Sequence, residues 1–202
     1  PSFYISREAK KYTTVVLNGD GGDELFAGYR RYVPFSKINL FNLNNISKNL
    51  IRQVSNVLPH PKEKISLYNY LFRLLVLAAQ KDPLKIYLSA TSDIFEGYLD
   101  YFYNPEFGLK NINYDLKCSQ ELMTNGLNII MNMDFNSILC GDLLVKMDIA
   151  TMHHALEARS PLLSKELLEF APLLSPQFKV RNSKTKYILR ILSKQYLPKD
   201  II

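Results

Sequence analysis

The sequence predicts an α/β protein that is mostly α-helical, with a single clear strand near its N-terminus. Residues Thr13–Leu17 are β-branched and apolar, which is typical of a strand buried on both faces, and we assign Thr14–Leu17 to the strand itself. The glycine-rich segment Asn18–Gly22 follows, and a helix is expected to begin at Asp23 or Glu24. Most of the remaining chain carries apolar residues at helical spacing.

The other helices are expected where apolar residues recur at intervals of three and four. Prolines separate several of them, at Pro59–Pro61 and again at Pro83. A segment rich in Asn, Tyr and Gly, residues 98–115, is expected to be a loop. The helices are expected at residues 6–12, 46–58 and 67–78, from Leu84, from Ser119, over 142–157 and over 187–196.

A lone strand cannot form a sheet, so Thr14–Leu17 must pair outside this chain or with a strand that the pattern does not reveal. We expect that sheet to be mostly parallel. The chain begins Pro1-Ser2-Phe3-Tyr4, with no initiator Met and no basic or apolar leader. It is therefore expected to be part of a longer protein.

Composition excludes several classes of protein. The 202 residues include 25 Lys and Arg against 19 Asp and Glu, and the cations form no dense block, so nucleic acid is not an expected partner. The longest apolar run, Leu74–Ala79, is too short to cross a bilayer, so no membrane partner is expected. Two cysteines, Cys118 and Cys140, cannot build a disulfide scaffold or a cysteine zinc site, and they favour the reducing cytoplasm.

The segment Asn18–Glu24 is the most informative stretch of the chain. It lacks the Gly-Lys-Ser/Thr of a Walker A loop, the third glycine of a dinucleotide-binding loop and the ligand spacing of an EF-hand. Its glycines let backbone N–H groups approach an anion, yet Asp20, Asp23 and Glu24 crowd the same segment. A divalent cation between carboxylates and phosphate, such as Mg²⁺, would reconcile these facts. In the alternative, Asp23 caps the helix and Glu24 complements its dipole.

A second candidate site residue is Asp148. If residues 142–157 are helical, Asp148 lies on a largely apolar helix face. The other members of that face are Leu144, Thr151, Met152 and Ala155. A carboxylate in such a place needs a partner or a shifted pKa. It is therefore either a site residue or half of a structural ion pair, with a lysine or with Arg159.

A third region lies at the entry to the last helix, where cations are concentrated. They are Lys179, Arg181, Lys184 and Lys186. Cations at the N-terminal end of a helix oppose its dipole. The conflict suits a site that faces phosphate, although a solvated basic loop is the commoner explanation.

Residues Val15–Tyr29 closely resemble the second ATP-site motif of the glutamine-dependent asparagine synthetases, a family that also includes the β-lactam synthetases. Two further stretches, Asp142–Leu163 and Lys184–Arg190, match the later part of the same synthetase domain. The middle of the chain, residues 33–133, matches only as helix.

The resemblance implies an adenine nucleotide α-hydrolase-like α/β core with a helical C-terminal part. Residues 1–32 would supply the strand, glycine loop and helix of the ATP site, and residues 33–202 the helical part. The implied enzyme adenylates the side-chain carboxylate of aspartate with MgATP and releases pyrophosphate. Ammonia from an N-terminal glutaminase domain then displaces AMP to give asparagine. The resemblance also allows a homodimer.

The resemblance assigns roles residue by residue, with ATP and Mg²⁺ as cofactors. Asp20 would take part in forming or attacking the acyl-adenylate, and Asp148 and Lys186 would be catalytic residues near it. Asp23 would bind Mg²⁺ beside the pyrophosphate. The residues implied to contact ATP are Asn18, Gly19, Gly21 and Gly22.

The chain departs from the family's pattern in several places. Asn18 replaces the usual Ser or Thr, and Ser164 replaces an Asp. The chain contains no Ser-Gly-Gly-x-Asp-Ser pyrophosphatase loop, no N-terminal cysteine nucleophile and no Arg-x-Lys-x-Gly-Phe lid. We therefore expect the first ATP loop and the glutaminase domain to be absent and the fragment alone to be inactive. Two alternatives stay open: an inactive helical interaction module that keeps the motif, or a relative that amidates or cyclises another carboxylate.

Overall fold

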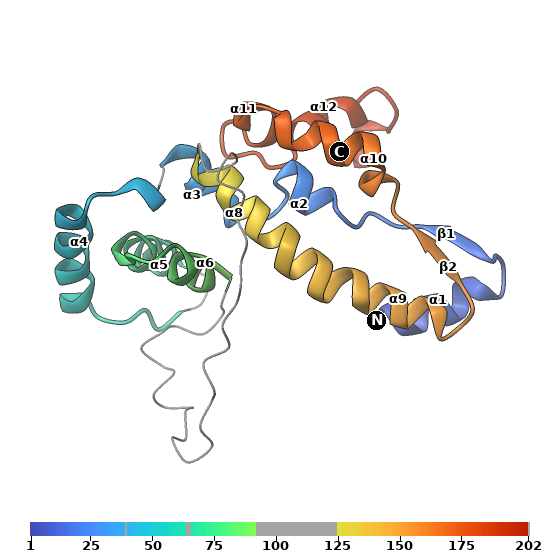
Figure 1. Cartoon of the computed structure of the whole chain (residues 1–202), viewed down its shortest axis with the longest axis horizontal. Helices are drawn as coiled ribbons and strands as arrows, with labels where there is room; N and C mark the ends of the chain where they lie inside the picture. Colours follow the sequence, from blue (N-terminus) through green and yellow to red (C-terminus); the bar gives the residue numbers. More distant parts are fainter. Residues whose placement is uncertain (39, 64–65, 92–124, 202) are drawn as a thin grey trace, which may run out of the picture. The chain divides into compact units, whose positions relative to one another are not determined.

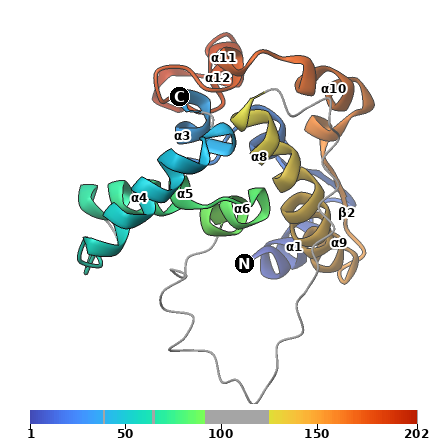
Figure 2. The same ribbon diagram turned by 60° about the vertical axis from the view of Figure 1, so that its left-hand side comes forward.

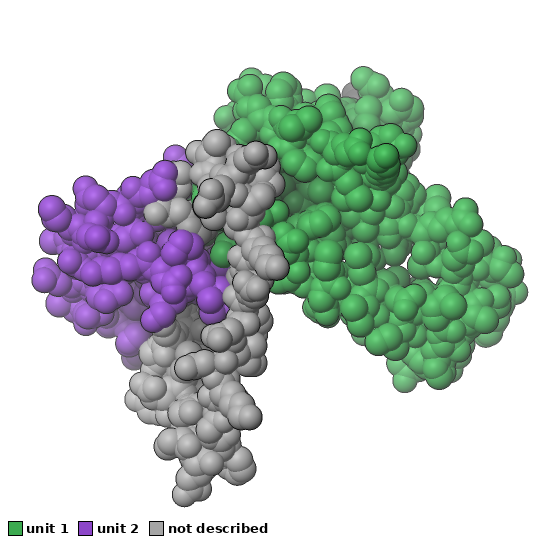
Figure 3. Space-filling model, viewed as in Figure 1, with its two compact units in different colours: residues 1–36, 118–202 green, residues 37–117 purple. Residues whose placement is uncertain are grey.

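The structure of the chain is a computed structural model (Figure 1 and Figure 2), and it describes residues 1–38, 40–63, 66–91 and 125–201. It divides into two compact units (Figure 3), which comprise residues 1–36 with 118–202 and residues 37–117. The predicted loop at 98–115 and the predicted helix start at Ser119 lie outside the described residues.

The first unit alternates helices with two short strands. Its elements are α1 (Ser2–Lys10), β1 (Val15–Leu17), α2 (Gly22–Phe26), α3 (Tyr32–Lys37, which ends at the unit boundary), α8 (Gly126–Asp134), the π-helix η5 (Phe135–Leu143), α9 (Leu144–Met152), β2 (Glu157–Arg159), η6 (Pro161–Leu163), α10 (Lys165–Phe170), η7 (Ala171–Leu173), α11 (Pro176–Lys179), α12 (Tyr187–Ser193) and η8 (Lys199–Ile201). The second unit contains η1 (Leu40–Asn42), α4 (Asn45–Val57), α5 (Leu67–Ala79) and α6 (Pro83–Thr91). The predicted strand is confirmed, and so are the helix that follows the glycine loop and the helices expected near 6–12, 46–58, 67–78, 84 and 187–196.

The predicted strand pairs with a second strand that the sequence pattern does not reveal. β1 and β2 run parallel, with Val16 opposite Ala158, which confirms the expected parallel pairing. Of the two alternatives for the lone strand, pairing with a strand that the pattern does not reveal is the one observed, whereas the expected helix up to Glu157 is wrong. The helix ends at Met152, and Ala155 takes a φ of 52°, a turn that leads the chain into β2.

The prediction that the first strand is buried on both faces is also wrong. Leu17 is 72% exposed and Val15 is 36% exposed. Within the described residues the sheet has only the strands β1 and β2, so the side chains of β1 have few neighbours. A two-stranded sheet is marginal by itself and needs support from packed helices.

That support comes from a long helical stretch that runs without interruption from Gly126 to Met152 through α8, η5 and α9, drawn yellow to orange in Figure 1. No new helix begins at Asp142, as the sequence suggested, because this residue lies inside the π-helical segment. α1 packs against α9, and the two lie side by side in Figure 1 and Figure 2. The Lys10 ammonium donates to the Ala155 carbonyl at 2.6 Å, just before β2.

A small hydrophobic core holds α2 in place. Leu25, Phe26 and Ala171 are buried at its centre. The side chains packed around them are Phe135, Leu162, Leu163, Leu167, Leu168, Leu174, Ile188 and Leu189. A helix as short as α2 is unstable alone in water, so its position depends on this packing.

A buried ionic cluster joins the start of α3 to the end of α8. Asp134 is 0% exposed, and Arg31 Nη2 lies 2.8 Å from its Oδ2. The Tyr32 hydroxyl donates to the same oxygen. Burial, together with the charge of Asp134, raises the pKa of Tyr32 far above its usual range, so this hydroxyl stays a donor. The Arg31 guanidinium also lies over the Tyr29 ring, 4.0 Å from its centroid.

In the second unit, α4 packs on α5, but not through the apolar face that the sequence suggests. The exposed members of that face are Ile46, Leu50, Val54 and Val57. Lys48 and Ser55, on another side of α4, are buried instead. Periodicity shows which residues share a face, but not whether another element covers it. No helix in the described ranges is long and apolar enough to cross a membrane.

Candidate nucleotide-binding site

The candidate site is the loop that connects β1 to α2. Its first residue, Asn18, continues the ladder of the sheet by donating its backbone N–H to the Arg159 carbonyl at 2.9 Å. Both polar atoms of the Asn18 side-chain amide form hydrogen bonds. The Ser160 hydroxyl donates to its Oδ1 at 2.5 Å, and its Nδ2 donates to Asp20 Oδ2 at 2.8 Å. β2 and the residue after it therefore orient the predicted site residues Asn18 and Asp20.

Asp20 is partly buried, and a cation lies near it. Burial raises the pKa of its carboxyl above the usual value, and the positive charge of Lys146 opposes this shift. Lys146 belongs to α9, so this helix brings a lysine close to the loop. Sequence reasoning did not select Lys146 as a site residue. The available signal was its position in the same motif as Asp148, two residues earlier.

The three glycines of the loop have different roles. Gly21 has a φ of 86°, and a Cβ there would lie 2.1 Å from Leu163 Cδ2. A Cβ on Gly22 would lie 2.9 Å from Leu162 Cδ1. Gly19 is exposed, and a Cβ there would have no neighbour within 4 Å. Gly21 and Gly22 thus let the loop pack on η6, and Gly19 leaves its backbone open to a ligand.

Two predicted site residues that are distant in the sequence meet at the start of α2. Lys186 Nζ lies 3.1 Å from Asp23 Oδ1, and both side chains are partly exposed. Lys186 has a φ of 51°, and its backbone N–H donates to the Ala27 carbonyl at 3.3 Å. This left-handed conformation holds the lysine against α2. Part of the basic segment before the last helix therefore faces the acidic loop.

Gly28→Ala is expected to destabilise the chain, because Gly28 adjoins this ion pair. A Cβ there would lie 1.6 Å from Asp23 Oδ1 and 2.4 Å from Lys186 Cε. Both side chains are partly exposed and can move aside, so the loss is mainly that of their ion pair and should lower the free energy of unfolding by up to about 1 kcal/mol. Urea unfolding followed by circular dichroism measures this change. Gly141→Ala is the matched control, since a Cβ there would have no neighbour within 4 Å; equal losses in both variants would contradict the prediction.

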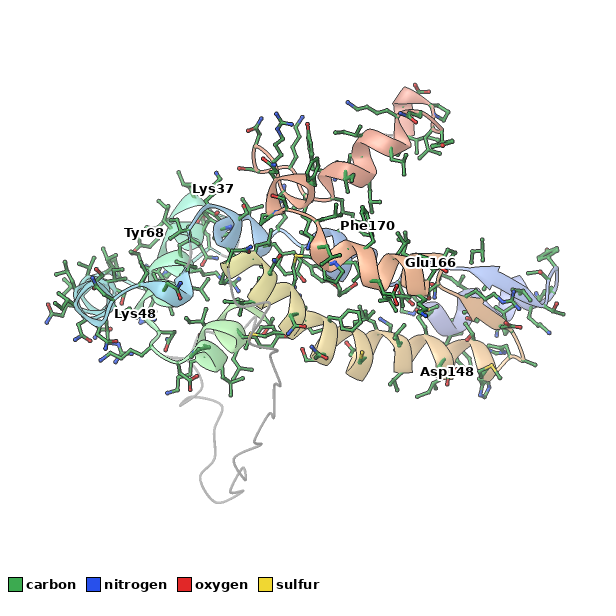
Figure 4. All side chains as sticks on the ribbon, turned by 45° about the horizontal axis from the view of Figure 1, so that its top comes forward. Lys37, Lys48, Tyr68, Asp148, Glu166 and Phe170 are labelled. Atoms are coloured by element: carbon green, nitrogen blue, oxygen red, sulfur yellow. The ribbon has the colours of Figure 1, made fainter. Side chains whose placement is uncertain are left out.

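Asp148 lies on α9, where Figure 4 labels it, and it is exposed. Among the described residues it forms no ion pair, and Arg159, its suggested structural partner, instead pairs with Glu157 at 2.7 Å. The helix face that it shares is only partly buried, since Thr151 is 2% exposed but Met152 is 58% exposed. The residue of α9 whose charge acts on the Asp20 carboxyl is Lys146, two residues before Asp148. A role for Asp148 at the reacting groups, and a common cavity for the loop residues, stay predictions.

The loop offers few donors for a metal ion. No three side chains capable of holding a metal come together within the part of the chain that the structure describes. Asp23 is partly exposed and contacts Lys186 through Oδ1, which leaves Oδ2. Mg²⁺ typically binds one or two carboxylates and completes its shell with phosphate oxygens and water. The donor set therefore fits an Mg²⁺ ion that binds together with a phosphate ligand, and not one caged by the protein alone.

Together, these features define the chain as an α/β protein with a glycine-rich strand-to-helix loop suited to an anion. A sequence model of the asparagine synthase family matches residues 1–202, and the chain therefore belongs to that family. The resemblance drawn from the motifs is confirmed.

Several curated relatives match the entire chain. Asparagine synthetase 1 (glutamine-hydrolyzing) of Bacillus subtilis strain 168 is 28% identical over 207 residues, which cover 100% of this chain and 31% of that protein. A protein of Mycobacterium bovis named "Putative asparagine synthetase (glutamine-hydrolyzing)" is 30% identical over 205 residues, which cover 100% of this chain and 30% of that protein. The chain thus spans less than a third of the length of these relatives. No solved structure gives a significant match.

Proposed function

We propose that this chain is part of the synthetase domain of an ATP-dependent ligase that converts a carboxylate, in the first place the side chain of aspartate, into an amide. The observation that carries the proposal is the charge arrangement of loop 18–23, in which Lys146 lies near Asp20 and Lys186 pairs with Asp23. Lysines beside an open glycine backbone at a helix start suit a polyphosphate. Because the chain covers about 30% of its relatives, we assign the activity to the longer protein.

In the proposed reaction, a carboxylate oxygen of aspartate attacks the α-phosphorus of ATP. An acyl-adenylate forms, and pyrophosphate leaves with the electrons of the bond that breaks. Ammonia, supplied by a glutaminase domain of the same protein, then attacks the acyl carbon, and AMP leaves as the amide forms. The nitrogen loses one proton in this step. Asp20 is our candidate for the acceptor, because its raised pKa improves it as a base.

The other loop residues would bind and position the nucleotide. We assign Asn18, Gly19 and the backbone of Gly21 and Gly22 to ATP. Lys186 is partly exposed, so its ammonium can pair with a phosphate oxygen as well as with Asp23. Mg²⁺ held by Asp23 and by phosphate oxygens would neutralise the charge that develops on pyrophosphate.

The alternatives make different demands on the same loop. An inactive interaction module has no need for lysines that balance Asp20 and Asp23, whereas a ligase acting on another carboxylate would use the same arrangement. We further infer, from the resemblance, an adenine nucleotide α-hydrolase-like fold for the complete domain and a homodimer. The low cysteine content supports a cytoplasmic location.

The test is ATP–pyrophosphate exchange by the longer protein, since this chain contains no pyrophosphatase loop. Exchange of radiolabelled pyrophosphate into ATP is expected to require aspartate. Asp20→Asn should slow amide formation from added ammonia by at least about tenfold, since Asp20 is the candidate proton acceptor of that step. Asp142→Asn, which alters an exposed acid of η5, is the matched control and should form the amide at the parent rate.

A panel of other carboxylates distinguishes the alternatives. If exchange requires a different carboxylate, the proposed substrate is wrong but the proposed ligase activity stands. No exchange with any carboxylate would overturn the ligase and favour the interaction module.

A further inference from the structure

A cavity of about 190 Å³ lies in the first unit, beside α2 and apart from loop 18–23. Met131, Phe135 and Leu168 contribute to its apolar wall. Two side chains of opposite charge, Glu24 of α2 and Lys179 of α11, also line it. Neither charged group has a part in the proposed ligase reaction.

Lys179 is a buried cation that has no carboxylate partner in the described part of the chain. It is 2% exposed, and its Nζ has a single weak contact, to Asn128 Oδ1 at 3.5 Å. Burial lowers its pKa to about 8, so the amine still carries its proton at neutral pH for most of the time. A buried charge without a counter-ion is costly, which points to a partner that the described residues do not provide.

Glu24 is equally buried, at 2% exposed, and is only half satisfied. The Tyr29 hydroxyl donates to its Oε1 at 2.5 Å. No described residue donates to Oε2. Glu24 and Lys179 form no ion pair with each other within the described residues, although they share the cavity. The cavity thus keeps an anion and a cation apart.

The size of the cavity limits what can fill it. An engineered apolar cavity of about 150 Å³ holds a benzene molecule, so the space here is enough for a small ligand with a branched aliphatic group. A phosphate compound would bring a second and third negative charge close to Glu24. A ligand with one charge would leave either Glu24 or Lys179 without a partner.

We propose that this cavity binds a free α-amino acid with a branched aliphatic side chain. The carboxylate of the ligand pairs with Lys179, its ammonium pairs with Glu24, and its side chain packs against Met131, Phe135 and Leu168. The inference does not depend on the proposed ligase reaction. Because Glu24 directly follows Asp23 in α2, occupancy of the cavity would also restrain the helix that carries the Asp23–Lys186 ion pair.

The test is a methyl NMR titration of the 202-residue chain labelled with ¹³C at its methionine methyl groups. The Met131 signal, assigned with a Met131→Leu variant, reports occupancy because Met131 lines the cavity. The probes are L-leucine, 4-methylpentanoate, which lacks the ammonium, and 3-methylbutylamine, which lacks the carboxylate. L-leucine should shift the Met131 signal and saturate, and each partial analogue should bind at least about tenfold more weakly, the scale of one charged hydrogen bond.

Two variants separate the charges. Lys179→Met should weaken L-leucine at least about tenfold without weakening 3-methylbutylamine, and Glu24→Gln should weaken L-leucine similarly without weakening 4-methylpentanoate. Lys194→Met, at an exposed lysine, is the matched control. The methyl spectrum without ligand shows whether each variant is folded. The proposal is overturned if L-leucine leaves the Met131 signal unchanged up to about 10 mM, if all three probes bind equally, or if a folded Lys179→Met variant binds L-leucine like the parent chain.

Discussion

Asp134→Ala should lower the free energy of unfolding of this chain by about 3–5 kcal/mol, the range for breaking a buried ion pair by removing one partner. Asp134 is fully buried, and the variant would leave the Arg31 guanidinium and the Tyr32 hydroxyl without their shared acceptor. Arg31 is itself only partly exposed, with 24% of its side chain accessible, so water compensates little. Urea unfolding followed by circular dichroism measures the loss.

Two controls separate this effect from general damage. Asp142→Ala removes an exposed acid from the same helical stretch and should change stability by no more than about 0.5 kcal/mol. The double variant Arg31→Met/Asp134→Leu replaces both charges with apolar groups and should recover part of the loss, because the Arg31 charge is removed with its partner while the buried Tyr32 hydroxyl still lacks its acceptor. A loss below about 1 kcal/mol in Asp134→Ala would contradict the prediction.

Lys186→Met in the longer protein should reduce aspartate-dependent ATP–pyrophosphate exchange by about 10²–10³-fold, the scale for removing one preorganised charge from a site. Asp23→Asn should cause a loss of the same order. Since Lys186 and Asp23 contact each other at 3.1 Å, we expect them to act as a unit. The double variant should therefore exchange no more slowly than the less active of the two single variants. Independent residues would instead give a loss equal to the product of the two single losses.

Lys165→Met is the matched control for this series. Lys165 is a surface lysine with 83% of its side chain accessible, and it faces Glu169 at 3.9 Å, a pair too exposed to matter for the reaction. Its exchange rate should equal that of the parent. Parent-like exchange in Lys186→Met would remove Lys186 from the site. Fully multiplicative losses in the double variant would show that Lys186 and Asp23 act independently.

The first thirty residues could be predicted because each element has a local signal. The β-branched residues of Thr14–Leu17 favour a strand, and the left-handed φ of Gly21 needs a glycine. The meeting of Asp23 with Lys186 had a weaker physical signal, the unfavourable cations at the entry to the last helix. Only the motif resemblance assigned both residues of this pair to the ATP site.

Other features depend on contacts that the local sequence does not encode. Glu157–Arg159 has no β-branched residue, and it is a strand because it pairs with β1, about 140 residues earlier. The exposure of Leu17 follows from the same non-local fact, since it depends on which strands cover β1. Lys146 could be recognised as a neighbour of Asp20 only once the course of α9 was known.

The π-helix between α8 and α9 gives the site some tolerance to changes in chain length. η5 winds Phe135–Leu143 with i→i+5 bonding, so it accommodates more residues per turn than the helices on either side. Deleting one residue from a regular α-helix rotates everything downstream by about 100°. Deleting one residue from η5, with a return to regular α-helix, would rotate α9 by less, because the tighter winding makes up part of the lost rotation. A gap placed in this stretch when relatives are aligned therefore disturbs the position of Lys146 beside the loop less than a gap in α8 or α9.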